Sequence, residues 1–277
     1  MAVSQVNLRY EVGVKMISSV KLYGHYISIR IRSMMQYKVS FLLNTIGQFL
    51  VSFNIFLGIF FLFQRFSKVE GFTYSEVLLC FSIMLMEFSM AECFGRGFDS
   101  FAWIVRKGEF DRIMVRPRSE ILQVLGSRFE LTRIGRMFQA IVMFVYGIAS
   151  NDIEWTMSKI ITVIFMLIGG TALFFGLFLI YAAFCFFTLE GLEFMNILTD
   201  GAREYGKYPV GIYGKRMLQF CTYIVPYALV QYYPLLYLLD RKTSLLYVFM
   251  PLLAFLFLIP CYAFWRFGVL HYKSAGS

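Results

Sequence analysis

Charged residues are scarce in this chain of 277 residues: Asp, Glu, Lys and Arg make up 16% of it, against about 25% in a typical soluble domain. Histidine occurs only twice, at His25 and His271, and neither has a second ligand at the spacing of a metal site. The sequence also has no Ser–His–Asp or Cys–His pattern and no paired carboxylates for acid–base catalysis. We therefore expect no metal site, no cofactor and no catalytic residue in this chain, and predict that it is not an enzyme.

Cysteine is too sparse and too scattered to build a disulfide framework. The five cysteines include no C-x-x-C pair, and each lies within or beside an apolar run. We expect them to be small buried hydrophobic residues. They are Cys80, Cys93, Cys185, Cys221 and Cys261.

Hydrophobic residues are correspondingly abundant. They make up 59% of the chain, and the mean hydropathy is +0.66. Long apolar runs of this kind predict an all-α polytopic membrane protein, because a helix needs about 20 apolar residues to cross the hydrocarbon core. We expect one transmembrane domain over residues 39–277, preceded by a cytoplasmic segment over 1–38 whose start lacks the apolar stretch of a cleaved signal peptide. The six expected spans are 39–63, 77–94, 131–149, 160–187, 217–239 and 245–264.

Two features of these spans lead to expectations about side-chain position and helix packing. Arg133 and Arg136 fall in the first turns of the third span, where we expect them to snorkel to the interface. Gly169–Gly170 and Gly176 in the fourth span predict close helix packing.

The distribution of Lys and Arg predicts the orientation. With the N-terminus inside, 21 of the 26 basic residues fall on one side of the membrane and 5 on the other. Cytoplasmic loops collect Lys and Arg, so both termini are expected in the cytoplasm. A net charge of +9 in a membrane protein is therefore better explained by orientation than by nucleic acid.

Before the first span, residues 15–38 place apolar side chains at helical spacing between Lys21, Arg30 and Arg32. This pattern is typical of a basic amphipathic helix that lies on the inner leaflet and is attracted by anionic lipid. The alternative is an ordinary cytoplasmic lead-in to the first span.

The longest expected cytoplasmic segment, 95–136, mixes charges with aromatic and aliphatic residues. Within it, KGEFDRIMVRPRS predicts a short helix that ends at Arg116–Pro117, because the residue before proline is pushed out of helical geometry. Such a helix, hung between two spans, is suited to contact a cytoplasmic partner. The alternative is a loop docked on the protein's own helices, and RNA binding is disfavoured because four acidic residues dilute the basic field.

The stretch GAREYGK at 201–207 matches most of a G-x-x-x-x-G-K-[ST] phosphate loop, but Tyr208 stands where the magnesium-binding hydroxyl belongs. No buried strand precedes it, and Pro209 disfavours a helix just after the lysine. We interpret it as a tightly turned, tyrosine-anchored cytoplasmic linker and not as a nucleotide site.

Two acidic residues lie inside the second span. Glu87 is at its middle, and an ionisable group at that depth is either a polar contact in a substrate path or subunit interface, or a protonated or hydrogen-bonded group that fixes helix packing. Glu92 is expected to pair with Arg96 one turn later.

The fifth span contains Pro226 and Pro234 with several tyrosines around them. Two prolines so close break the helix, which predicts a re-entrant element between the fifth and sixth spans. The alternative is a plain span whose tyrosines form an interfacial belt.

The stretches GEFDRIMVRPRS, FELTRIGR and NILTDGAREYGKYPVGIYGK…TYIVPYALVQYYPLLYLLDR resemble the permease subunits of bacterial type-2 ABC (ABC-2) exporters, in particular the branch that pairs with a second permease and a separate ATPase. The resemblance runs along nearly the whole chain. It implies six spans, an N-terminal interfacial helix, a coupling helix between spans two and three, and a location in the bacterial inner membrane.

The resemblance also implies residue roles. The coupling helix falls on 108–119, with Glu109, Phe110, Asp111, Arg112 and Arg116 as contacts to the ATPase. ATP and Mg²⁺ would then bind to two copies of the partner ATPase, and the second permease would be a related chain or a second copy of this one. The candidates for polar residues along the translocation path are Asn44, Gln48, Asn54, Glu87 and Gln231.

A different class of function is a secondary transporter or channel that ATP does not drive. It usually has more ionisable residues at depth and internal repeats, and neither is evident in this sequence.

Overall fold

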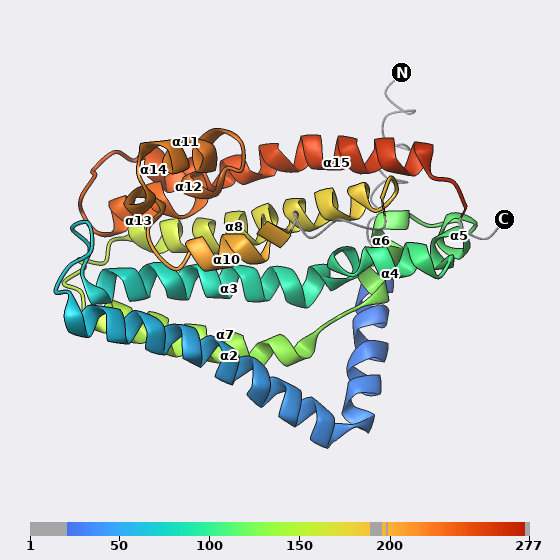
Figure 1. Ribbon diagram of the computed structural model, residues 1–277, viewed down its shortest axis with the longest axis horizontal. Coiled ribbons are helices and arrows are strands. Elements are labelled where there is room, and N and C mark those ends of the chain that lie inside the picture. Colours follow the sequence, from blue (N-terminus) through green and yellow to red (C-terminus); the bar gives the residue numbers. More distant parts are fainter. Residues whose placement is uncertain (1–20, 189–195, 198, 275–277) are drawn as a thin grey trace, which may run out of the picture.

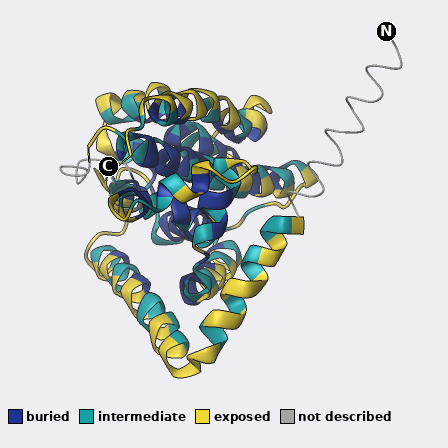
Figure 2. Cartoon of the chain, turned by 90° about the vertical axis from the view of Figure 1, so that its right-hand side faces the viewer, coloured by how far each residue is buried: buried dark blue, intermediate teal, exposed yellow. Residues whose placement is uncertain are grey.

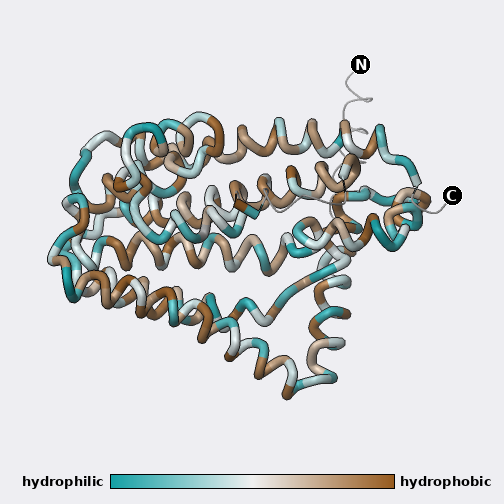
Figure 3. The backbone as a smooth tube through the Cα atoms, viewed as in Figure 1, coloured by the Kyte–Doolittle hydropathy of each residue, from teal (hydrophilic) through white to brown (hydrophobic). Residues whose placement is uncertain are grey.

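The computed structural model describes residues 21–188, 196–197 and 199–274. Among these residues, five helical segments are long and apolar enough to cross a membrane, and Figure 1 shows them running side by side. Their apolar lengths stand out in the hydropathy view of Figure 3. The five are Lys38–Arg65 (α2), Tyr74–Arg106 (α3, Tyr74–Asp99, followed by α4, Phe101–Arg106), Leu131–Ala149 (the turn η1, Leu131–Arg133, and α7, Ile134–Ala149), Met157–Phe184 (α8) and Leu246–His271 (α14, Leu246–Phe249, the turn η3, Met250–Leu253, and α15, Ala254–His271).

Helix α3 is the centre of the bundle. It packs against α7 on one side and α8 on the other, α15 covers the far side of α8, and α2 lies outermost against α7. The most apolar stretch of α3 is 83% buried, whereas that of α2 is only 11% buried. The long exposed flank of α2 is yellow in Figure 2 and carries apolar side chains such as Leu43 and Leu50, so lipid or a further protein must cover it.

Glycines on α8 make this packing close, as the sequence predicts. A Cβ atom on Gly169 would come within 2.3 Å of the Pro251 carbonyl oxygen, and one on Gly170 would come within 2.1 Å of the Glu87 carboxyl carbon. Gly176 faces Leu258 and Cys261 of α15. Small residues at these positions let helices approach to backbone distance. The predicted burial of the cysteines is confirmed for four of them, and Cys93 is half-buried.

The two ends of the bundle differ. One end, the α5 end, carries the helix of residues 21–36, α4, the short helices α5 (Glu109–Met114) and α6 (Glu120–Ser127), and the C-terminal tail after α15. The opposite end carries the connections 66–73, 150–156 and 239–245. Charged residues close this end: Arg241 donates to Gly71 O and Glu76, and Lys159 pairs with Asp240 at 2.7 Å.

The segment predicted as a cytoplasmic linker, 188–216, is not a surface loop at the α5 end; its residues 189–195 and 198 lie outside the described part. Helix α10 (Asp200–Tyr205) packs against α3 inside the row of long helices, and Ala202 is fully buried. Gly206 lies close to Cys80 near the start of α3, because the Gln231 amide donates to the carbonyl oxygens of both. The prediction of a cytoplasmic linker failed because the polar residues of 200–207 do not reveal a short helix that packs against α3 through Ala202.

The expected fifth span, 217–239, is likewise not a continuous helix. It consists of α11 (Lys215–Tyr223), α12 (Tyr227–Val230) and α13 (Tyr232–Leu238), preceded by the turn η2 (Val210–Tyr213). Pro226 stands at the N-cap of α12, where its missing N–H and fixed φ angle interrupt the helix. The predicted break is therefore present, and six continuous transmembrane helices are not.

The sidedness inferred from Lys and Arg survives this change. If all four basic residues of 201–216 are moved from the majority side, the count becomes 17 against 9, which still places the α5 end in the cytoplasm. That orientation remains a prediction.

Candidate functional site

Helix α5 protrudes at one end of the bundle but is fixed to the core by one aromatic side chain. The chain turns into α5 at Gly108, whose φ of 64° is readily adopted only by glycine. Phe110 is fully buried and makes edge-to-face contacts with four rings. They belong to Phe101, Phe186, Trp265 and Tyr272, with centroid distances of 5.1–6.2 Å. Phe110 thus joins α5 to α4 and to the ends of α8 and α15.

This burial revises one predicted role. Phe110 does not face a partner, because its ring lies inside the chain. The residues exposed here are instead Arg112 and Met114 of α5 and, just after it, Val115 and Arg116, of which Val115 is 84% exposed. Asp111 is half-buried and accepts a hydrogen bond of 2.7 Å from the Ser274 hydroxyl. From the sequence alone Phe110 could not be told from Met114 and Val115, since all three lie in one short stretch among charged residues.

One face of α5 lines a groove. Glu109, Arg112 and Ile113 follow the i, i+3, i+4 spacing of one helical face, and together with Arg116, just after the end of α5, they border an open groove of about 430 Å³. The other wall belongs to the helix of residues 21–36, which runs crosswise to the long helices at the α5 end.

The helix of residues 21–36 is attached to the bundle by two tyrosines. The Tyr23 hydroxyl donates to Phe94 O at 3.3 Å, and burial followed by the nearby Cys93 raises the pKa of Tyr23 to about 12, so the hydroxyl keeps its proton at neutral pH. The Tyr26 ring covers Gly126 of α6 so closely that a Cβ atom there would come within 2.3 Å of it. The described part of 15–38 is helical and runs crosswise to the long helices, and its location at the membrane interface stays a prediction.

The polar side chains of α6 hold the turn that follows α5. The Gln123 amide donates to Ile113 O and Arg118 O, both at 3.1 Å. Glu120 at the start of α6 pairs with Arg266 of α15 at 2.9 Å. The α4–α6 region is therefore a built unit joined to α3 and α15, and not a loose loop.

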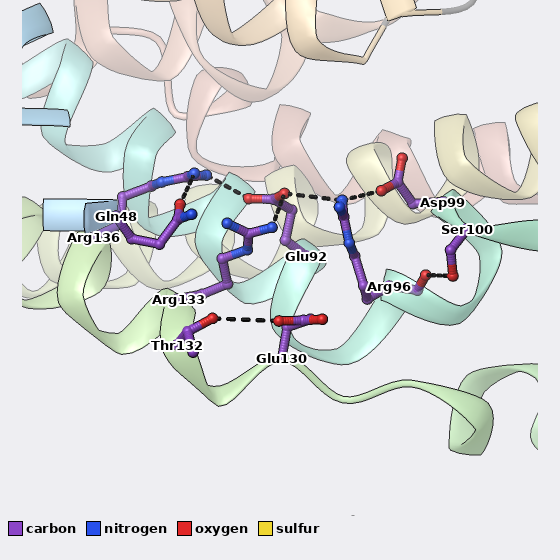
Figure 4. A network of polar contacts seen from close by, with 9 residues as sticks. All are labelled: Gln48, Glu92, Arg96, Asp99, Ser100, Glu130, Thr132, Arg133 and Arg136. Carbon is purple, nitrogen blue, oxygen red and sulfur yellow. Dashed lines mark hydrogen bonds and ion pairs between the residues drawn. The ribbon is translucent and has the colours of Figure 1, made fainter. Parts of the chain in front are cut away.

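Deeper in the bundle, a network of charges surrounds Glu92 (Figure 4). Glu92 is 5% exposed and forms ion pairs with Arg133 at 3.2 Å, with Arg136, and with Arg96 at 3.4 Å. Arg136 also donates to the Gln48 side-chain oxygen at 2.6 Å. The network thus joins α2, α3 and the η1–α7 segment through charge-assisted hydrogen bonds.

Two predictions meet in this network. The expected pairing of Glu92 with Arg96 is confirmed. The expected snorkelling of Arg133 and Arg136 is wrong, because both are buried and turn inward to Glu92. A charged side chain at depth is stabilised more by an opposite charge on a neighbouring helix than by a strained reach to the interface.

Glu87 occupies the opposite environment. It is fully buried, and no hydrogen-bond partner reaches either carboxyl oxygen among the described residues. It packs against Gly170 of α8, and the Tyr227 hydroxyl of α12, also buried, has no described partner either. A carboxyl group in such surroundings is held in its neutral form, because an unpaired buried charge is far more costly.

The five residues predicted to line a path do not converge. Glu87 and Gln231 are buried in the core, and Gln48 is engaged with Arg136. Asn44 and Asn54 lie on exposed parts of α2, where Asn44 is within 3.5 Å of Ser40. The buried tyrosine Tyr227 was missed, although its position after Pro226 marks the break in the helix.

Comparison with known proteins agrees with this architecture. A family model described as ABC-2 family transporter protein matches residues 49–276, which is most of the chain and includes α3–α15. No curated protein and no solved structure matches. A bundle of apolar helices with a built helical unit at one end, together with this match, establishes a membrane permease component: the chain belongs to the ABC-2 transporter family.

Proposed function

We propose that this permease is the membrane subunit of an ATP-driven exporter, and that a separate ATPase docks on α5. ATP and Mg²⁺ would bind to two copies of that ATPase and not to this chain. A second permease, either a related chain or another copy, would complete the translocation path. In this proposal the protein lies in a bacterial inner membrane with the α5 end and both termini in the cytoplasm.

The observation that carries the proposal is the mechanical link through Phe110. Arg112 of α5 and Arg116 just after it are exposed for a partner, while Phe110 ties the inner face of α5 to α4, to the end of α8 and to α15. Since α4 continues directly from α3, a push on α5 would reach the central helix of the bundle. A surface helix that only connected two spans would not need contacts between Phe110 and the core. Asp111 and Glu109 complete the proposed contact set.

In the proposed cycle, closure of the two ATPase subunits presses the α5 helices and moves the two permeases apart. The broken segment α11–α13 acts as a re-entrant element near the outer face. Gln48, Glu87 and Gln231 become part of the path only when the bundle rearranges, because in this conformation they are engaged or buried.

The test is a pull-down of the detergent-solubilised chain from its native cell. We expect an ATPase to co-purify with the unaltered protein and its yield to fall at least tenfold with the double substitution Arg112→Glu, Arg116→Glu. Lys68→Glu, an exposed charge reversal in the 66–73 connection at the opposite end, is the matched control and should leave the yield unchanged. Absence of an ATPase from the unaltered preparation, or equal loss with Lys68→Glu, would overturn the proposal.

The alternative, a secondary transporter or channel without ATP, is favoured by one observation only: the buried, unpartnered Glu87 on the central helix. It predicts that transport in vesicles responds to an ion gradient and is unaffected by removing ATP.

A further inference from the structure

We propose that the groove between the helix of residues 21–36 and α5 binds the anionic headgroup of a phospholipid. The proposal concerns the permease alone, and it goes beyond ATPase coupling. It rests on the charge of the groove, its position and the fixed spacing of its walls.

The charge of the groove comes from three arginines on two different elements. Arg30 belongs to the helix of residues 21–36, Arg112 to the groove face of α5, and Arg116 to the turn just after α5. Among the described lining residues Glu109 is the only acidic one, so these residues together carry two excess positive charges. Among the described residues, none of the three arginines has an acidic group within ion-pair distance. The planar fork of donors on each guanidinium suits the oxygens of a phosphate diester.

The position of the groove selects a lipid. The helix of residues 21–36 runs crosswise to the long helices at the α5 end and leads directly into α2 at Lys38 (Figure 1). In the proposed orientation, this is the level of the inner-leaflet headgroups, where basic pockets on the cytoplasmic side bind anionic lipids. Ile29, 62% exposed, borders the same groove and offers an apolar surface for the start of an acyl chain. A volume of about 430 Å³ suits one headgroup better than a folded protein segment.

The walls of the groove are held apart at a set distance. The Tyr26 ring packs on Gly126 of α6, and the Tyr23 hydroxyl donates to Phe94 O of α3. These contacts fix the wall formed by the helix of residues 21–36. Phe110 and the Gln123 hydrogen bonds fix the other. The arginines therefore need little reorganisation to bind, which lowers the entropic cost of capture.

Lipid binding is compatible with docking on α5. Each guanidinium has five N–H donors, so Arg112 and Arg116 can contact a phosphate in the groove and still donate to a protein acceptor on their exposed side. Arg30 belongs to the lipid site alone, which makes it the residue of choice for the test.

The experiment is native mass spectrometry of the delipidated full chain, titrated with phosphatidylglycerol as the probe. We expect one tightly bound phosphatidylglycerol and a loss of affinity of about fivefold with Arg30→Gln, the effect of one basic residue near an anionic group. The Arg30→Lys substitution, which keeps the charge but not the fork of donors, should recover part of the loss. Arg32→Gln is the matched control: Arg32 lies on the same helix with the same charge but lines a different groove.

Three results would overturn the proposal. Equal losses with Arg30→Gln and Arg32→Gln would indicate diffuse attraction to anionic surfaces. Unchanged binding in Arg30→Gln, with the variant folded by circular dichroism, would remove Arg30 from any site. A competition arm with phosphatidylcholine and glycerol phosphate distinguishes the source of the phosphate: displacement of phosphatidylglycerol by soluble glycerol phosphate at similar concentration would assign a free-anion site instead of a lipid site.

Discussion

Glu87 and Glu92 lie five residues apart on α3, and both are buried, yet their surroundings are opposite. Glu92 has three arginine partners, two of them on the η1–α7 segment. Glu87 faces a glycine of α8 and has no described partner. The comparison shows that the charge of a carboxyl group inside a membrane bundle depends strongly on what the neighbouring helices present.

Among these substitutions, Glu92→Gln is expected to cause the largest loss in the free energy of unfolding. The substitution leaves Arg133 and Arg136 buried without their counter-charge, and breaking a buried pair in this way costs about 3–5 kcal/mol. Denaturant titration in micelles should show this loss in the free energy of unfolding. If Glu92→Gln and Glu87→Gln cost the same, the contrast between the two sites is wrong.

A smaller loss in the free energy of unfolding is expected from Gly170→Ala. The added methyl group would collide with the Glu87 carboxyl, and such overpacking costs about 1–3 kcal/mol. The double substitution Gly170→Ala, Glu87→Ala separates this clash from other effects, because removing the carboxyl makes room for the methyl group. Losses that simply add in the double variant would contradict the contact.

Arg96→Gln tests the more exposed part of the Glu92 network. Its side chain is 29% exposed, and Glu92 retains two arginines without it, so we expect a loss of only about 1 kcal/mol. The same titration with added salt should narrow the difference, because solvent-accessible pairs are screened. A loss as large as that of Glu92→Gln would mean that Arg96 anchors the network.

The smallest effect is expected from Glu87→Gln. It exchanges one neutral polar group for another of similar shape, so the free energy of unfolding should change by less than about 1 kcal/mol. Transport measured with the reconstituted complex gives a second reading. Loss of transport with unchanged stability would assign Glu87 to the path, while unchanged transport would leave it a packing residue.

Sequence reasoning captured the parts of the fold that depend on long apolar runs. Five of the six expected spans each correspond to one candidate span: 39–63, 77–94, 131–149, 160–187 and 245–264. The span expected at 160–187 begins and ends within three residues of α8. The breaks at Pro226 and around α12 were also foreseen from the prolines. Apolar length and proline chemistry act locally, so a single sequence shows them.

What could not be predicted depends on contacts between distant elements. Helix α10 has a polar sequence, and its Ala202 is buried only because α3 packs against the helix, while Gln231 bonds to Gly206 just after it. Arg133 and Arg136 face inward only because Glu92 lies on the adjacent helix. Phe110 could not be told from its exposed neighbours, because Phe186 and Trp265, which bury it, come more than 70 residues later.

The broken segment α10–α13 has a consequence for how the protein enters the membrane. None of these short helices is long and apolar enough to insert alone, so during synthesis the segment must wait until α3 and α8 are in place to receive it. Gln231, by donating to Cys80 O and Gly206 O, closes the assembled core after insertion. Because α3 and α8 precede this segment in the sequence, a chain with α8 disrupted would leave the segment unseated at the bilayer surface, and topology reporters fused within it would record that misplaced position.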